Sequence, residues 1–477
     1  MVPVHAACAL LSLAPLLVLG VPPIWTQPEQ VHLSYPGKCL NLLPLPHVFS
    51  FRDTFPPPLL CNANQYPGHM TLGFFFTGVP GSMVVTWTTF NKTESKVEYG
   101  LLGGRLFEMS AKGDATLFVD WGEEKRKMFI HRVSLTGLKP AASYAYHCGS
   151  DVGWSDVFFF TALNDSTSFS PRFALYGDLG NENPQSLARL QKETQLGMYD
   201  VILHIGDFAY DMHEDNARIG DEFMRQIQSI AAYVPYMTCP GNHEATYNFS
   251  NYRNRFSMPG NTESLWYSWN LGSAHIISLS TEVYFYLEFG LELLFKQYEW
   301  LRKDLEEANK PENRAVRPWI ITMGHRPMYC SDDDQDDCTT FDSKVCKRQN
   351  PIPPGLEDLF YRYGVDLELW AHEHTYERLW PVYSDKVCNG SKEQPYVNPK
   401  APVHIITGSA GCRERTDRFN PNPKDWSAFR STDYGYTRMQ VVNASHLYLE
   451  QVSDDEYGKV IDSIWVVKDK HGFSAWF

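Results

Sequence analysis

Short apolar runs that end in glycine and a polar side chain recur through the second half of the chain. The run Val-Ile-Leu-His-Ile at residues 201–205 is followed by Gly206, Asp207 and Tyr210. Similar runs lie at residues 172–176, 319–323 and 365–370. An apolar run of this length between turn residues is typical of a buried parallel strand. Open α/β sheets bind ligands at the carboxyl ends of such strands, so the polar residues after each run are candidates for a functional site.

Helical patterns between these runs predict an α/β domain of layered sheets over residues 171–477. Residues 292–309 repeat apolar side chains at helical spacing, and four of them form one stripe: Leu294, Tyr298, Leu301 and Leu305. Asn183 and Pro184 have the residue types of a helix cap and a first-turn proline. Strand patterns return between residues 403 and 467 and are expected to complete a second sheet. The predicted fold is therefore two sheets flanked by helices.

Residues 30–163 carry a different pattern, in which short runs alternate apolar and polar side chains. Several such runs separated by turn residues predict a β-sandwich. The segment Leu138-Lys-Pro-Ala-Ala-Ser-Tyr144 resembles the tyrosine corner of fibronectin type III-like domains, a packing feature without chemistry of its own. The runs lie at residues 30–35, 81–90, 95–99, 115–120, 127–134, 143–148 and 157–160. We therefore predict an N-terminal fibronectin III-like domain.

Residues 38–77 interrupt this domain with a stretch rich in Pro, Leu and Phe that has neither strand nor helix periodicity. A structureless stretch of this length is uncommon inside a compact domain. The codons for Gly37-Lys38 can contain a splice-donor sequence, and those for the Phe-rich end of the segment can contain an acceptor. One hypothesis is a translated retained intron, which a gene without an exon boundary at Gly37 would exclude. The alternative is a family-specific insertion.

The insertion also has a predicted consequence for folding. Closing a long loop costs little entropy, so the second domain is expected to fold despite it. Exposed Phe and Leu side chains would instead promote aggregation, and the chain would then be an unproductive splice form.

The first 20 residues predict a secretory signal peptide. Residues 6–20 are apolar but too short for a membrane span and are interrupted by Pro15. No Lys or Arg precedes them, so an ordinary apolar tail is the alternative. No later segment has about 18 uninterrupted apolar residues, and a soluble protein that is secreted or routed to lysosomes is expected. Five glycosylation sequons fit this route: Asn91, Asn164, Asn248, Asn389 and Asn443.

The ten cysteines show no Cys-x-x-Cys spacing of the kind that holds structural zinc. Two loops concentrate cysteines, and disulfides within each loop are expected, with the connectivity left open. The first loop holds Cys330, Cys338 and Cys346, and the second is flanked by Cys388 and Cys412.

The formal net charge of −14 argues against a protein held to nucleic acid or to a membrane surface by its overall field. We expect neither partner. A small phosphorylated substrate would then need a local positive centre, for which a metal is the obvious choice.

Side chains of metal-ligand type follow five of the predicted strands. In order along the chain they are Asp178; Asp207 with Tyr210; Asn242 with His243; His325; and His372 with His374. Two carboxylates, a phenol, an amide oxygen and three of the imidazoles make seven donors, which suits two metal ions that share a carboxylate. In the His-x-His pair both rings lie on one side of extended backbone, so each reaches a different ion. Each residue alone has an ordinary structural explanation, but five such motifs in order favour a metal site.

These motifs resemble the ordered motif set of the purple acid phosphatases, within the calcineurin-like metallophosphoesterase superfamily. The sandwich and the segment Thr375-Tyr-Glu-Arg378 resemble the large plant-type and animal plant-like members. The resemblance runs from about residue 30 onward except for residues 38–77, and Tyr210 separates this family from other metallophosphoesterases. The motifs are Gly177-Asp178-Leu-Gly180, Gly206-Asp207-Phe-Ala-Tyr210, Gly241-Asn242-His243-Glu244, Gly324-His325 and Ala371-His372-Glu-His374.

The resemblance implies an acid phosphatase in which a metal-bound hydroxide attacks the phosphorus of a phosphate monoester in line. The implied ligands of Fe(III) are Asp178, Tyr210 and His374. Those of a divalent ion are Asn242, His325 and His372, with Asp207 as the bridge. Donor chemistry agrees, because phenolate and carboxylate favour a hard trivalent ion whereas amide and imidazole suit a divalent one, with Zn favoured over Fe or Mn.

His243 is the predicted catalytic residue, because it directly follows a ligand and is placed to bind phosphate or protonate the leaving oxygen. A purely hydrogen-bonding role is the alternative. Unlike the plant enzymes, this chain has no further histidine between His325 and the acidic loop at residues 332–337, so the leaving-group acid stays open and His213 is a second candidate. The acidic loop would repel polyphosphates if it lay at the mouth. Ala371 replaces the usual glycine, a mild change if its backbone angles are ordinary.

Two other functions are compatible with the sequence. A phosphodiesterase or nucleotide pyrophosphatase would use the same metals, and turnover of an aryl monoester against a bis-aryl diester separates these activities. A glycoprotein that uses its sandwich for adhesion would contain no iron.

Overall fold

The computed structural model describes residues 25–40, 75–78, 81–333, 335, 338 and 355–477. The predicted signal peptide and residues 41–74 of the predicted insertion lie outside them, as does Cys346. The two ends of the insertion pair as antiparallel strands, β2 (Gly37–Leu40) and β3 (Phe75–Gly78), with Gly37 opposite Gly78. The ends of this segment therefore meet, and the retained-intron hypothesis stays a prediction.

The N-terminal region is a sandwich whose two sheets share one long strand, β6. Its strands are β1 (Glu29–Ser34), β4 (Met83–Thr89), β5 (Ser95–Leu101), β6 (Met109–Val119), β7 (Lys127–Leu135), β8 (Ser143–Ser150), β9 (Gly153–Trp154) and β10 (Phe158–Thr161). They pair in the order β1-β4-β7-β6-β5-β8-β10, with β9 added to β8. Residues 109–113 of β6 pair with β5, and residues 114–119 pair with β7. A strand that changes partner at its midpoint joins the two sheets.

The predicted tyrosine corner is confirmed. The backbone N–H of Lys139 donates to Oη of Tyr144 at 2.9 Å, which ties the loop before β8 to the strand. Tyr144 is buried in the sandwich core together with Trp87 and Val133. An ion pair then fixes the sandwich to the second region, because Asp221 of that region accepts from Arg126 of the sandwich at 2.7 Å. Arg255, also of the second region, donates to the same carboxylate at 2.9 Å.

The second region contains two sheets, and parallel strands form the centre of each. The first has the order β13-β12-β11-β23-β24-β25, in which β11, β12 and β13 are parallel. Its strands are β11 (Arg172–Tyr176), β12 (Val201–Ile205), β13 (Tyr236–Cys239), β23 (Gly435–Val441), β24 (His446–Ser453) and β25 (Lys459–Val467). The antiparallel half of this sheet comes from the end of the chain.

The second sheet has the order β14-β15-β16-β17-β21-β18-β22, with β15, β16, β17 and β21 parallel. Its strands are β14 (Tyr267–Leu271), β15 (Ala274–Ser278), β16 (Trp319–Met323), β17 (Leu367–Trp370), β18 (Tyr376–Leu379), β21 (Val403–Thr407) and β22 (Ser427–Ser431). A small ribbon of β19 (Val382–Tyr383) and β20 (Lys386–Val387) lies apart. The C-terminal strands were expected to complete one sheet but are divided between both.

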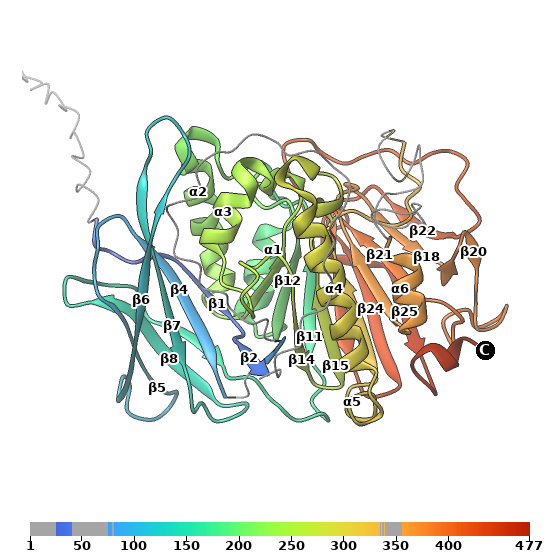
Figure 1. Cartoon of the computed structure of the whole chain (residues 1–477), viewed down its shortest axis with the longest axis horizontal. Helices are drawn as coiled ribbons and strands as arrows, with labels where there is room; N and C mark the ends of the chain where they lie inside the picture. Colours follow the sequence, from blue (N-terminus) through green and yellow to red (C-terminus); the bar gives the residue numbers. More distant parts are fainter. Residues whose placement is uncertain (1–24, 41–74, 79–80, 334, 336–337, 339–354) are drawn as a thin grey trace, which may run out of the picture.

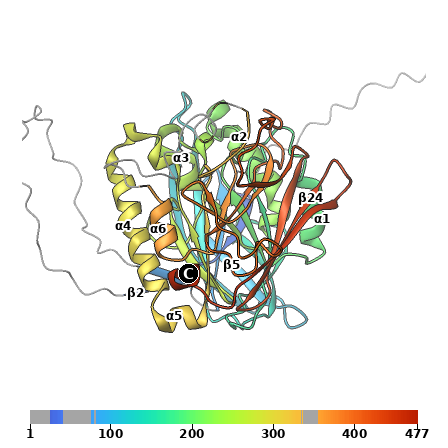
Figure 2. The same cartoon turned by 90° about the vertical axis from the view of Figure 1, so that its right-hand side faces the viewer.

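Helices cover the outer faces of the two sheets, so the layers run helix, sheet, sheet, helix. Side chains of α4 and α6 pack with outward-facing residues of β15 and β16, whereas alternate residues of these strands face the other sheet. Figures 1 and 2 show α4 and α6 on one side of the stack and α1 on the opposite side. The helices are α1 (Leu187–Gln195), α2 (Glu214–Ala231), α3 (Thr246–Arg255), α4 (Leu291–Ala308), α5 (Pro311–Val316) and α6 (Glu357–Arg362). Short 3₁₀ helices are η1 (Asn242–Glu244), η2 (Glu282–Tyr284), η3 (Leu287–Phe289) and η4 (Phe473–Trp476). The predicted layered fold is confirmed.

One predicted helix start is wrong. Asn183 and Pro184 do not open α1, which begins at Leu187 after Ser186. Asn183 adopts a left-handed φ of 61° and its Nδ2 donates to the carbonyl oxygen of Cys412 at 2.8 Å. A long-range contact therefore uses the side chain that the sequence suggested as a cap.

The cysteines follow the prediction in one loop and depart from it in the other. Cys330 and Cys338 form a disulfide. Cys388 and Cys412 are both free, so the disulfide expected between the ends of the second loop is wrong. Cys412 is instead buried beside His374. None of the helices among the described residues combines the length and the hydropathy needed to cross a membrane.

Candidate metal centre

The carboxyl ends of five strands, three from one sheet and two from the other, open onto the same edge of the stack. β11, β12 and β13 are neighbours in the first sheet, and β16 and β17 are neighbours in the second. After these strands come, in order, Asp178; Asp207 and Tyr210; Asn242 and His243; His325; and His372 and His374. Parallel strands place such residues together because their carboxyl ends lie at one edge. The seven predicted ligands form two connected groups.

Asp178, Tyr210 and His374 make up the first group. Oη of Tyr210 lies 3.2 Å from Oδ1 of Asp178 and 2.7 Å from Nε2 of His374. Nε2 of His374 lies 3.6 Å from the same carboxylate oxygen. Donor atoms about 2.1 Å from one ion are about 3 Å apart when they subtend a right angle at it. These three atoms therefore have the spacing of ligands around a single ion.

Nε2 of His325 is the centre of the second group. It lies 3.0 Å from Oδ1 of Asn242, 3.2 Å from Nδ1 of His372 and 3.3 Å from Oδ2 of Asp207. The other ring nitrogen, Nδ1, lies 2.9 Å from the carbonyl oxygen of Ile205 and so must donate to it. That bond orients the ring and leaves Nε2 facing the group, as is usual for a histidine that binds a metal. The spacing again fits one ion.

The two groups are joined through the protein. The backbone N–H of His372, in the second group, donates to Oδ2 of Asp178 in the first at 3.1 Å. Asp207 is close enough to raise the pKa of both Asp178 and Tyr210 by its charge. Asp207 therefore belongs to the second group by distance and acts on the first group through its charge.

The charges of the centre call for a cation. Burial raises the pKa of Asp178 and of Tyr210 well above their ordinary values, and the charge of Asp207 adds to both shifts. Burial lowers the pKa of His325, but the charge and hydrogen bond of Asp207 together with the charges of Asp178 and Glu282 outweigh burial and raise that pKa to about 10. Protonated His325 therefore acts as a counter-charge for the carboxylates. Two metal ions at these donors would supply that positive charge more fully.

The backbone around the centre is held in unusual conformations. Four predicted ligands have left-handed φ angles, namely Asp178 at 58°, Asp207 at 51°, Tyr210 at 48° and His372 at 73°. Such residues cost free energy and persist where the surrounding structure fixes them, often at functional sites. Ala371 has no such φ, so its replacement of glycine is mild as expected.

Two glycines make room for the ligands. Gly206 has a φ of 82°, and a Cβ there would lie 2.4 Å from Nδ1 of His325. A Cβ on Gly241 would lie 2.1 Å from Oδ1 of Asp207. Any side chain at either position would displace a predicted ligand.

Glu244 organises the two ligand loops and was not identified as a site residue from the sequence. Its buried carboxylate accepts hydrogen bonds from the backbone N–H groups of Asp207, Phe208 and Gly241 at 2.9, 3.1 and 2.9 Å. Burial and the charge of Asp207 raise its pKa to about 7. Its place at the end of the Gly-Asn-His-Glu motif was the available signal.

His243 lies beside the two groups and is held by a second carboxylate, Asp211. Nδ1 of His243 is 2.9 Å from Oδ1 of Asp211, and Nε2 is 3.8 Å from Oδ2 of Asp207. Burial lowers the pKa of His243, but the charges of Asp207 and Asp211 outweigh it and raise that pKa to about 9. Arg413 in turn donates to Asp211 at 3.0 Å. The ring of His213 packs against Tyr247 instead, with centroids 5.8 Å apart.

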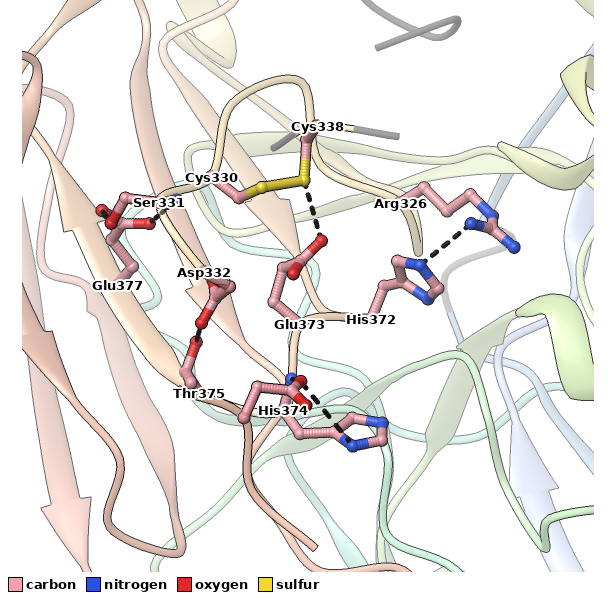
Figure 3. The surroundings of a disulfide bond; sticks show 11 residues. Arg326, Cys330, Ser331, Asp332, Cys338, His372, Glu373, His374, Thr375 and Glu377 are labelled. Carbon is pink, nitrogen blue, oxygen red and sulfur yellow. Dashed lines mark hydrogen bonds and ion pairs between the residues drawn. A yellow bond between two sulfur atoms is a disulfide. The ribbon is translucent and has the colours of Figure 1, made fainter. Parts of the chain in front are cut away.

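The disulfide lies over the His-x-His segment, as Figure 3 shows. Glu373, the buried residue between the two histidines, has an oxygen 2.8 Å from Sγ of Cys338. Asp332, the first residue of the acidic loop, is also buried and accepts from Oγ1 of Thr375 at 3.0 Å. At least the start of this loop therefore points inward, whereas Asp333 is exposed. Residues 334, 336 and 337 lie outside the described residues.

Comparisons with known families match most of the second region and most of the first. A model of the calcineurin-like phosphoesterases matches residues 171–376, and one of the C-terminal part of iron/zinc purple acid phosphatase-like proteins matches residues 401–463. A model of the N-terminal domain of purple acid phosphatases matches residues 71–162. The last of these begins inside the predicted insertion.

Individual relatives agree with these matches. The chain is 68% identical over 458 residues to acid phosphatase type 7 of Danio rerio, covering 95% of this chain and 94% of that protein. It is 53% identical to acid phosphatase type 7 of Homo sapiens, and the match covers 95% of this chain and 93% of that protein. Among solved structures, a purple acid phosphatase from yellow lupin seeds superposes with a TM-score of 0.69 at 26% identity, covering 82% of this chain and 72% of that one.

Proposed function

The chain belongs to the purple acid phosphatases of the calcineurin-like phosphoesterase superfamily, and we propose that it hydrolyses phosphate monoesters at a centre of two metal ions. Metal-dependent acid phosphatase activity follows from the family and from relatives that bear this name. The observation that carries the dinuclear proposal is the pair of donor groups, each spaced for one ion, with Asp207 able to influence both.

The family implies iron together with a divalent ion. We assign Fe(III) to Asp178, Tyr210 and His374, because a phenolate and a carboxylate suit a hard trivalent ion. A divalent ion, with Zn favoured over Fe or Mn, is assigned to Asn242, His325 and His372. Asp207 is assigned as the bridge. When bound, the two ions would neutralise phosphate oxygens and lower the pKa of a coordinated water.

The protein's own contribution beyond the ligands is assigned to His243. Asp211 fixes the ring through Nδ1, so Nε2 is the nitrogen that faces Asp207 and the space beside the ligands. Both carboxylates favour the imidazolium form, which can bind a phosphate oxygen or give its Nε2 proton to the leaving oxygen. Asp211 is therefore a positioning residue for His243.

We further propose a secretory protein that carries N-glycans and acts on small phosphorylated substrates. The sequons at Asn91, Asn164, Asn248, Asn389 and Asn443 support this route, because all five lie at least partly exposed. Neither nucleic acid nor a membrane is proposed as a partner, in keeping with the net charge of −14.

Metal analysis and a visible spectrum of the purified protein test the proposal. We expect about one iron per chain and a charge-transfer band that Tyr210→Phe abolishes or shifts strongly, since the band requires an Fe(III)-phenolate bond. Tyr247→Phe, which changes an exposed tyrosine 43% accessible to solvent, is the matched control and should leave the band intact. A protein with iron whose band survives in Tyr210→Phe would exclude the assignment of Tyr210.

A further inference from the structure

A surface cavity of about 540 Å³ lies where the sandwich meets helix α3. Three aromatic rings contribute to its lining: Trp121 from the turn between β6 and β7, Tyr247 from α3 and Phe289 from η3. Trp121 and Tyr247 belong to different domains, and their rings stack with centroids 6.3 Å apart. Trp121 is 61% exposed and Tyr247 is 43% exposed, so the cavity presents aromatic surface to solvent.

The turn that carries Trp121 is fixed to the second region. Nδ2 of Asn251 in α3 donates to Oδ1 of Asp120 at 3.4 Å, and the backbone N–H of Glu124 donates to Oδ1 of Asn216 in α2 at 3.0 Å. Figure 1 shows the turn between β6 and β7 beside α2 and α3. Contacts before and after Trp121 therefore hold its ring in place, and the aromatic part of the cavity is preformed.

The remainder of the lining is polar and includes Arg253, Asn254 and Glu263. Arg253 pairs with Glu263, and its Nη1 donates to the backbone carbonyl oxygen of Asn248 at 3.1 Å. Aromatic surface bordered by hydrogen-bonding groups suits a sugar ring. The C–H groups on the face of a sugar pack on the electron-rich face of an aromatic ring, and its hydroxyl groups need polar partners.

A glycosylation sequon lies in the same cavity. Asn248 and Ser250, the two residues that define the sequon, both line the cavity, whereas Phe249 between them is fully buried. Tyr247, Asn248 and Phe249 all have left-handed φ angles, of 56°, 57° and 60°. This turn of α3 therefore departs from regular helix geometry where it places the sequon at the cavity and Phe249 in the core.

We propose that the cavity holds the first sugars of an N-glycan on Asn248. The glycan is attached to the amide of a side chain that lines the cavity, so its first N-acetylglucosamine begins at the cavity wall. Trp121 and Tyr247 pack against the sugar, which thereby bridges the sandwich and the second region. A volume of about 540 Å³ is in the range of sites that hold ligands larger than one sugar ring. This inference rests on the N-glycosylation proposed above.

The leaving group of a large phosphate ester is the competing occupant. Phe289 stacks on Tyr286 with centroids 6.1 Å apart, and Oη of Tyr286 lies 3.4 Å from the carbonyl oxygen of the predicted ligand Asn242. The cavity is thus connected to the metal centre through one aromatic side chain. A leaving group must bind from solution, however, whereas a glycan on Asn248 is held at the cavity at high effective concentration. The glycan is therefore the favoured occupant.

Site-resolved glycan release from the secreted, native protein by a peptide N-glycosidase tests the proposal. This enzyme cuts the bond between the glycan and the asparagine, which a sugar packed in the cavity shields. Mass spectrometry gives the rate at each sequon, and division by the rate in denatured protein removes the effect of local sequence. We expect the glycan on Asn248 to be protected about 10-fold or more relative to that on Asn91, in the exposed turn between β4 and β5.

Trp121→Ala should remove most of this protection, because it deletes the sandwich side of the aromatic surface. Trp465→Ala, which removes a 49% exposed tryptophan of β25, is the matched control and should leave both release rates unchanged. Melting temperatures identify a variant that does not fold. If Trp121→Ala is such a variant, Tyr247→Ala decides by the same measurement.

Equal release rates at Asn248 and Asn91 would overturn the inference, as would protection at Asn248 that survives in folded Trp121→Ala. Secreted protein without a glycan on Asn248 would overturn both the proposed modification at this site and the inference. Fast release at Asn248, combined with a KM for a bulky aryl phosphate that Trp121→Ala raises, would assign the cavity to the leaving group instead. A protein with a protected glycan that hydrolyses no monoester would overturn the proposed phosphatase function and leave this inference intact.

Discussion

The two ends of strand β17 carry buried polar clusters of opposite kinds. Asp366 directly precedes the strand and is fully buried, and it accepts from Arg314 at 3.2 Å and from the buried ammonium of Lys468. His471 lies 3.1 Å from the same carboxylate. At the other end, the segment that starts at His372 belongs to the candidate metal centre, where carboxylate oxygens and imidazole nitrogens face one another.

The difference lies in where the counter-charge comes from. Burial alone would raise the pKa of Asp366, but the charges of Lys468 and of its other partners outweigh burial and hold that pKa well below its usual range. In the candidate metal centre, burial and the charge of Asp207 raise the pKa of Asp178 and Tyr210. A buried carboxylate paired with Lys and Arg has a structural role, whereas a cluster whose counter-charges are the imidazoles of predicted metal ligands is suited to receive ions.

The largest expected effect is on catalysis, at the carboxylate assigned as the bridge. Asp207→Asn should lower kcat by about 10³-fold or more, because the amide removes a negative charge that both ions need. Assay of an aryl phosphate with metal analysis measures this, and the exposed Asp333→Asn is the control. Activity within tenfold of the wild type would contradict the assignment of Asp207.

At the opposite end of β17 the expected effect is on stability. Asp366→Ala should lower the free energy of unfolding by about 3–5 kcal/mol, because it leaves Lys468 and Arg314 buried without their partner. Denaturant titration measures the change, and Asp151→Ala at an exposed site should stay within about 0.5 kcal/mol. Metal content and activity per folded molecule should not change. Loss of metal in Asp366→Ala would show that the two ends of the strand are coupled.

Removal of the ions should also lower stability, by a similar or smaller amount. An ion present at 100 to 1,000 times its dissociation constant stabilises the folded state by about 3–4 kcal/mol, which a chelator would remove. Thermal or denaturant unfolding before and after chelation measures this loss. Asp366→Ala should show the same loss as the wild type, since its cluster contains no ion. A melting temperature that chelation leaves unchanged would argue against ions at the centre.

The smallest expected effect is a pH dependence of the Asp366 cluster. Because the folded-state pKa of Asp366 is depressed, its contribution is complete above the unfolded-state pKa of about 4 and declines as the pH falls toward the folded-state value. The stability difference between the wild type and Asp366→Ala should therefore shrink by about 1 kcal/mol between pH 5 and pH 3. Urea titrations across this pH range test this expectation. A stability difference that grows on acidification would contradict it.

Local patterns predicted much of this protein. The apolar runs at residues 172–176, 201–205 and 319–323 coincide with β11, β12 and β16. The long amphipathic helix predicted at residues 292–309 is α4, which spans Leu291–Ala308. Such features can be read from sequence because burial imposes a period on neighbouring residues, and a polar residue after a strand is a local signal. The same signals selected all seven candidate ligands.

Contacts between distant segments could not be read in this way. Asp211 directly follows one recognised motif and Glu244 ends another, but nothing local shows that Asp211 orients His243 or that Glu244 ties together two ligand loops. Cys412 was expected in a disulfide, and Asn183 at a helix cap, because each residue type commonly has that local role. In the fold, Cys412 instead lies beside His374. The side chain of Asn183 donates a hydrogen bond to the carbonyl oxygen of Cys412.

The sequence by itself determined the residue types on which the predicted chemistry depends, since the order and type of donors after its strands predict two metal ions of different hardness. Only the tertiary structure decided which charges are already neutralised. Asp366 and Asp207 are both acidic residues at the ends of apolar runs, and the sequence does not distinguish their roles. The fold brings Lys468 to Asp366 and the predicted ligand His325 to Asp207. Charge compensation depends on distances between segments far apart in the chain, which local patterns do not encode.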